Sequence, residues 1–144
     1  MLEARNPVSL PRLVASLFLM LALTACPPDQ RPRAFPSPPE GSNEVFREAL
    51  SAAPGAELIV ADLFLKPNTE GPAHYHPWEE YLYVIEGSAI LDIEGMEPRT
   101  LLGRQSAIIP AKAVHRPKAG PWGLRALVIR VHKQGDPVAI PVDQ

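Results

Sequence analysis

Apolar and polar residues alternate in several short stretches after residue 43, and glycine or proline separates one stretch from the next. Residues 57–65 are the clearest example, because Ile59, Ala61, Leu63 and Leu65 would share one face of an extended strand. Further strands are predicted where aromatic, β-branched and other apolar residues recur, over residues 81–85, 89–95, 99–102, 107–109 and 124–131. About seven or eight short strands at this spacing predict an all-β sandwich or barrel.

The segments between these strands are rich in turn residues. Residues 66–72 and 119–123 are predicted to be loops, and Glu86-Gly87-Ser88 is predicted to be a tight turn. Residues 44–53, EVFREALSAA, are compatible with a helical turn or with an edge strand, and the following Pro-Gly pair ends either one.

The chain begins with a segment typical of an export signal. Arg5 and Arg12 precede an uncharged run over residues 13–25. As a helix this run would be about 20 Å long, which is too short for a hydrocarbon core of about 30 Å. Residues 1–25 are therefore predicted to be a secretory signal peptide, with a short anchor as the alternative.

This predicted signal ends in Leu-Thr-Ala-Cys, which resembles the bacterial lipobox. The resemblance implies that Cys26 is lipidated and tethers the protein to a membrane of the cell envelope, on its periplasmic or extracellular face. The alternative is that Cys26 is an incidental thiol. Residues 26–43 are crowded with proline and are predicted to form an extended tether, which leaves residues 44–144 as the barrel domain.

Composition excludes some functions. A net charge of −2 gives no electrostatic reason to expect a nucleic-acid partner. A single cysteine cannot form an internal disulfide.

The segment GPAHYHPWEEYLYVIEG, residues 71–87, contains the strongest chemical signal. His74, His76 and Glu80 have the same parity, so in an extended chain their side chains lie on one face, with the histidine Cβ atoms about 6.5 Å apart. Two imidazoles and a carboxylate that converge in an apolar sheet are typical of a metal site. The alternative is a pair of exposed loop histidines and a solvated acid.

These residues resemble the first motif of the cupin superfamily, G-x5-H-x-H-x3–4-E-x6-G. The match runs from His74 through His76 and Glu80 to Gly87, whereas Asn68 stands at the position of the leading glycine. The resemblance implies a double-stranded β-helix, also called a jelly-roll barrel. It is closest to small single-domain cupins of the quercetin-dioxygenase-like kind.

The second cupin motif, G-x5-P-x-G-x2-H-x3-N, is matched only in part. Pro110 and His115 keep its spacing, but Gly103 is one residue early, Lys112 replaces the inner glycine and Ala119 replaces the asparagine. The resemblance implies that His115 is a fourth metal ligand, and Lys112 indicates a different turn after Pro110.

Three imidazoles and a carboxylate leave coordination positions open on a divalent Fe, Mn, Ni, Cu or Zn ion. We therefore expect a small-molecule metalloenzyme of dioxygenase-like type. The alternatives are a metal-dependent sugar isomerase and a non-catalytic lipoprotein that binds a metal or small ligand, because cupin-like barrels have many functions.

Other residues near the motif have less specific interpretations. Glu79 is predicted to point outward or to orient a ligand, and Leu82 and Val84 to lie in the core or to line a pocket. His132 is predicted to be solvated. Tyr81 and Tyr83 point away from the ligands, which is compatible with a homodimer through the outer β-face.

Overall fold

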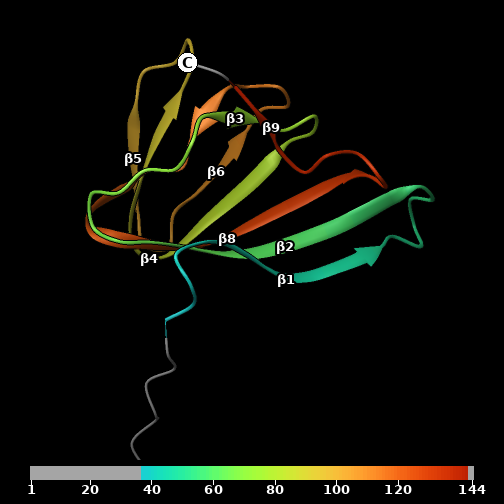
Figure 1. Cartoon of the computed structure of the whole chain (residues 1–144), viewed down its shortest axis with the longest axis horizontal. Coiled ribbons are helices and arrows are strands. Elements are labelled where there is room, and N and C mark those ends of the chain that lie inside the picture. Colours follow the sequence, from blue (N-terminus) through green and yellow to red (C-terminus); the bar gives the residue numbers. More distant parts are fainter. Residues whose placement is uncertain (1–36, 143–144) are drawn as a thin grey trace, which may run out of the picture. The chain divides into compact units, whose positions relative to one another are not determined.

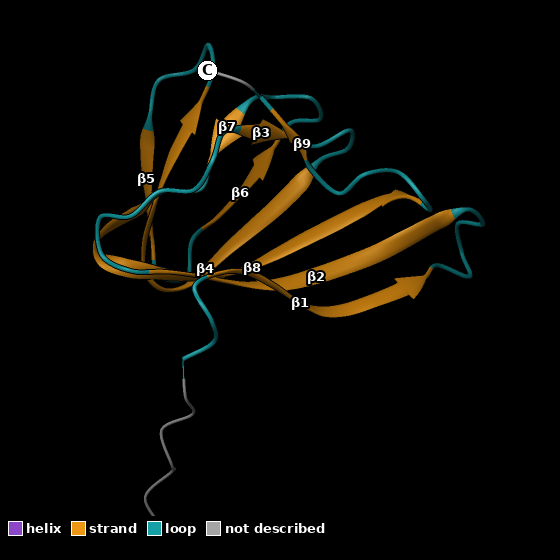
Figure 2. Ribbon diagram, viewed as in Figure 1, coloured by secondary structure: helices purple, strands orange, loops and turns teal. Residues whose placement is uncertain are grey.

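The computed structural model describes residues 37–142. The predicted signal peptide, Cys26 and most of the predicted tether lie outside the described residues. Within residues 37–142 the chain forms strands, turns and bends and no helix, which confirms the all-β prediction (Figure 2). No helix in this part of the chain is long and apolar enough to span a bilayer.

Nine strands make up the described part of the chain, and four of them are much longer than the other five. In chain order they are β1 (Gly41–Ala49), β2 (Ala56–Leu65), β3 (His74–Tyr75), β4 (Glu80–Ile93), β5 (Arg99–Leu102), β6 (Ser106–Ile109), β7 (His115–Arg116), β8 (Ala119–Lys133) and β9 (Ile140–Pro141). Residues 44–49 of the segment that was compatible with a helical turn or an edge strand belong to β1, which is an edge strand, and residues 50–53 lie in the turn that follows it.

The strands form one strongly curled sheet in the order β1-β2-β8-β4-β7-β3-β9, with β5 and β6 also paired to β4. All pairs are antiparallel. Strand β4 produces the curl, because its first half pairs with β8 and β6 whereas its last two residues pair with β7. The short strands β3, β7 and β9 thus lie across from the long strands β2 and β8 (Figure 1).

Two sequence predictions are wrong within the long strands. Residues 86–88 are not a turn, because β4 continues through them with register shifts around Glu86 and Gly87. Residues 119–123 are not a loop but the irregular start of β8. Glycine and proline here mark bulges that bend paired strands, and a bulge uses the same residue types as a turn.

The core lies inside the curl and follows the predicted alternation. On β2 the buried residues are Ile59, Ala61, Leu63 and Leu65. The main cluster adds side chains from the other strands, namely Leu82, Val84, Ala89, Leu91, Ile93, Leu101, Ala107, Ile109, Ala119, Leu124, Ala126 and Val128. Leu82 and Val84 are thus core residues.

The outer face of the sheet also carries apolar side chains. Phe46, Val60, Ile129, Tyr81 and Ile108 are consecutive cross-strand partners on β1, β2, β8, β4 and β6. Phe46, Tyr81 and Ile108 are 44%, 43% and 57% exposed. This row is called the outer apolar row below.

Candidate metal centre

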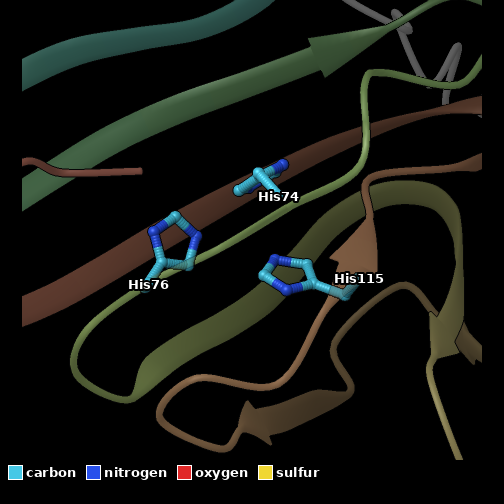
Figure 3. A group of neighbouring side chains, drawn as sticks. All are labelled: His74, His76 and His115. Carbon is cyan, nitrogen blue, oxygen red and sulfur yellow. The ribbon is translucent and has the colours of Figure 1, made fainter. Parts of the chain in front are cut away.

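Three histidines come together where β3 and β7 meet. His115 on β7 is paired with Ile93 on β4 and with His74 on β3. His76 follows β3 directly. The ring centroids of the three pairs are 4.5–5.2 Å apart, and one ring nitrogen of each histidine lies within 4.8 Å of the other two (Figure 3). Curling of the sheet therefore brings His115 to the other two, as the cupin resemblance implied.

Each histidine is oriented by a backbone carbonyl. The Nδ1 atom of His74 lies 3.0 Å from the carbonyl oxygen of Pro72, that of His115 lies 3.0 Å from Ala113 O, and that of His76 contacts Val138 O. A carbonyl oxygen can only accept, so Nδ1 must carry the proton in each ring. This tautomer leaves the lone pair of each Nε2 free, which is the usual arrangement of metal-binding histidines.

Burial favours the same protonation state. It lowers the pKa of His74 and of His115, because a charged imidazolium would be poorly solvated there. The backbone carbonyls of Pro72 and Ala113 raise these pKa values but do not cancel the effect of burial. Both rings are therefore neutral at pH 7, as metal binding requires.

Glu80 lies beside the three histidines, against His76. The distance from its Oε2 atom to His76 Nε2 is 2.8 Å, yet His76 Nε2 is buried and makes no hydrogen bond. Two groups with free lone pairs repel each other at this distance unless a cation lies between or beside them. Adjacent ligands on an octahedral ion are separated by about 3 Å, so this pair of atoms fits a shared cation.

Glu80 also contacts Arg130 on β8, its cross-strand partner. Arg130 Nε donates to Glu80 Oε2 over 2.8 Å, and Nη2 lies 2.7 Å from the same oxygen. Burial raises the pKa of Glu80, but the positive charge of Arg130 opposes this effect, and the pKa is lowered to about 2. The carboxylate is thus ionised at any pH at which the histidines are neutral.

Two cavities adjoin the histidines. The smaller, of about 70 Å³, lies toward the core and is lined by His74, Glu80 and His115 together with apolar residues such as Leu63, Leu82 and Val128. The larger, of about 480 Å³, is lined by His74, His76 and Arg130 and by apolar residues such as Ile59, Ala61 and Val138. A small, mainly apolar ligand could therefore reach the histidines.

Two of the departures from the cupin motifs, Asn68 and Lys112, have backbone angles that glycine adopts easily. Their φ angles are 57° and 64°. The turn at Lys112 is thus one that a glycine could also make. The Lys112 amide donates to His76 O over 2.7 Å, so this turn holds the segment that carries a metal-site histidine.

The structure corrects one further prediction and adds one residue. His132, predicted to be solvated, is only 4% exposed and lies 3.5 Å from buried Glu57. Arg130 was not among the predicted site residues, although its parity matches that of Leu124, Ala126 and Val128. This shared parity was the feature of the sequence from which an inward-pointing arginine could have been predicted.

Glu79 is exposed, in agreement with its predicted outward direction.

Comparison with known proteins supports the same fold. Residues 62–129 match the family model described as Cupin domain. A conserved protein with a double-stranded beta-helix domain from Klebsiella pneumoniae has a similar structure, with a TM-score of 0.55 and 20% identity over 79% of this chain and 100% of that one. The prediction of a double-stranded β-helix is therefore confirmed.

Two enzymes are also similar in structure. Oxalate decarboxylase from Bacillus subtilis has a TM-score of 0.53 and 20% identity over 59% of this chain and 24% of its own. DMSP lyase DddQ from Ruegeria pomeroyi has a TM-score of 0.50 and 22% identity over 60% of this chain and 43% of its own. The chain thus spans less than half the length of either enzyme. No curated protein sequence matches the chain.

Proposed function

Since residues 62–129 match the cupin domain and the fold is a double-stranded β-helix, we propose that this protein is a cupin that binds a divalent metal. His74, His76 and His115 would hold the ion through Nε2, and Glu80 would be the fourth ligand through Oε2. The observation that carries the proposal is that Nδ1 of each of these three histidines faces a carbonyl, which leaves each Nε2 free, and that one ring nitrogen of each lies within 4.8 Å of the other two. Nitrogen-rich ligation suits Fe, Mn, Ni, Cu or Zn.

We further propose that the protein is a small-molecule metalloenzyme of dioxygenase-like type. A divalent metal in this site would supply Lewis acidity and, if it is redox-active, electron transfer to dioxygen. The chain itself provides neutral histidines, an ionised Glu80 and apolar walls that exclude water from one side of the site. Three or four protein ligands leave room for a substrate next to the two cavities.

The first test is metal content. Protein purified without chelator should contain about one divalent ion per chain, and His115→Ala should lose it. His132→Ala is a matched control, since His132 is buried but lies outside the three-histidine group. Wild-type protein without metal above trace would refute the proposed centre. Dioxygen consumption with a panel of catechols and thiols, in Fe-loaded and Zn-loaded protein, then tests the dioxygenase-like activity.

A non-catalytic binding protein is the second proposed function. Glu79, the one general base that the sequence offered near the ligands, is exposed and lines an outer groove that none of the three metal-site histidines lines. Ligand binding without turnover in the same panel would favour this function. A sugar isomerase is less compatible with the site, because most of the exposed area of the cavity walls is apolar.

We also propose that the protein is exported and lipid-anchored through Cys26. The support is the basic start, the short apolar run over residues 13–25 and the lipobox-like tetrad that ends in the single cysteine. Cys26→Ser should move the protein from the membrane fraction to the soluble fraction or block its processing. Unchanged fractionation would refute the anchor.

A second copy of the chain is the proposed partner of the outer apolar row. Two neighbouring charges, Asp62 and Arg125, pair with each other over 2.9 Å, so they do not oppose the approach of a second copy. Tyr81→Lys and Ile108→Lys should each shift the mass in solution from dimer to monomer. Exposed Met96→Lys, on a turn away from this row, is the control. A wild-type monomer at high concentration would refute the dimer.

A further inference from the structure

Arg130 is a buried, charged residue at the proposed metal centre, and it is not one of the proposed ligands. Its side chain is 10% exposed, and that of its partner Glu80 is 6% exposed. An arginine usually meets a carboxylate with two nitrogens on two oxygens. Here both Nε and Nη2 lie against the single oxygen Oε2, at 2.8 and 2.7 Å.

The same oxygen is the atom of Glu80 that lies 2.8 Å from His76 Nε2. A cation bound at His76 and the guanidinium of Arg130 would therefore draw on the negative charge of one oxygen. Both partners are buried, so salt and water screen this competition only weakly.

We propose that Arg130 is a positioning residue of the metal centre that limits how tightly the ion is held. It fixes Oε2 of Glu80 beside His76 and takes up part of its charge, so the carboxylate donates less to the ion and the ion stays more electrophilic. This inference rests on the proposed metal centre. It goes beyond that proposal because it assigns a role to a residue that is not a ligand.

A purely structural role predicts the opposite result. If Arg130 only balances the charge of Glu80 so that the barrel folds, its removal loosens the site and weakens metal binding. If Arg130 competes with the ion, its removal leaves the ion as the only counter-charge of Glu80 and tightens binding. The direction of the change in affinity therefore separates the two roles.

The test uses Co²⁺ as the probe, titrated against a chelator of known affinity into the full chain. Arg130→Met should bind Co²⁺ at least about tenfold more tightly than wild type, which is the size of effect typical of residues that contact metal ligands. In Glu80→Gln protein the same Arg130→Met change should give a gain of threefold or less, because the competed oxygen has lost its charge. The ligand-field absorption of bound Co²⁺ should shift in Arg130→Met.

Arg130→Lys is the matched control. It keeps the positive charge but has one nitrogen instead of two to place against Oε2, so its affinity for Co²⁺ should lie between those of wild type and Arg130→Met. Should Arg130→Met not fold, Arg130→Gln decides the test, since glutamine is neutral but can still donate a hydrogen bond to Oε2. Tighter binding by Arg130→Gln supports the proposal, and equal or weaker binding overturns it.

The outcomes separate this inference from the proposed metal centre. Wild-type protein that binds no Co²⁺ would overturn both. Wild-type protein that loses Co²⁺ in His115→Ala, but binds it equally or more weakly in Arg130→Met, would leave the metal centre standing and overturn the role of Arg130.

Discussion

Gly87, the last glycine of the histidine-rich segment, is required by both its backbone angle and its surroundings. Its φ is +74°, and a Cβ atom at this position would overlap the carbonyl oxygen of Gly123 and lie 2.7 Å from its carbon. Both obstacles are backbone atoms of β8, which cannot rotate out of the way as the atoms of a side chain could. Gly87→Ala should therefore force β4 and β8 apart at the bulge.

The expected cost can be worked out from these two effects. A left-handed φ costs a non-glycine residue about 1–2 kcal/mol, and overpacking typically costs about 1–3 kcal/mol more. Gly95 provides a matched control, because its φ is +79° but a Cβ atom added there would have no neighbour within 4 Å. Gly95→Ala should therefore lose only the first contribution, and Gly87→Ala about 2–5 kcal/mol in all.

Urea denaturation followed by fluorescence of the two tryptophans gives the free energies of unfolding. For a domain of this size the difference between the two variants corresponds to several degrees in Tm. Equal losses in Gly87→Ala and Gly95→Ala would refute the reasoning, since they would mean that contact between the two bulged strands adds nothing beyond backbone strain.

Two further predictions concern pH and the second motif. The free energy of unfolding of metal-free protein should fall as pH drops below about 6.5, because the lowered pKa values of His74 and His115 mean that the unfolded chain binds these protons first. It should fall again by about 3 kcal/mol between pH 4.5 and pH 2, because the pKa of Glu80 is lowered from 4.5 to about 2; Glu80→Gln should lack this second stage in urea titrations. Lys112→Gly should raise the melting temperature, because glycine adopts a φ of 64° without strain, whereas Lys112→Ala should not. A lower melting temperature in Lys112→Gly would contradict this account of the turn.

Much of the fold could be predicted because alternation is a local property. On β2 every second residue from Ile59 to Leu65 is buried, as the pattern indicated. The continuity of β4 through Gly87 could not be predicted in the same way. A glycine with positive φ serves a turn and a bulge equally well, and only the partner strand, here Gly123 on β8, decides between them.

The site could be predicted in part for a similar reason. His74 and His76 are neighbours in sequence, and the motif spacing pointed to His115, which the curl of β4 then brings beside His74. The orienting contact of His76 with Val138 and the pairing of Arg130 with Glu80 join residues far apart in the chain. Such contacts depend on strand register, which single-strand patterns do not contain.

The position of the proposed metal centre follows from a change in the inward-facing residues of β2 and β8. Along β8 these residues are apolar from Leu124 to Val128 and then become Arg130 and His132, and along β2 they are apolar from Leu65 to Ile59 and then become Glu57. Arg130 is bound to Glu80, and Glu57 is bound to Arg47 on β1, so these inward charges are paired across strands rather than solvated.

The three histidines lie at this boundary, because His76 contacts Glu80 on the charged side while His74 and His115 adjoin the apolar cavity. An ion at this boundary would have a low-dielectric wall on one side, where its field on a bound ligand is weakly screened, and an ionised carboxylate on the other. A fully apolar lining would leave the ion without a counter-charge, and a fully polar one would admit water that competes for its open positions. The boundary therefore combines the two conditions that a metal-dependent reaction on an apolar small molecule needs.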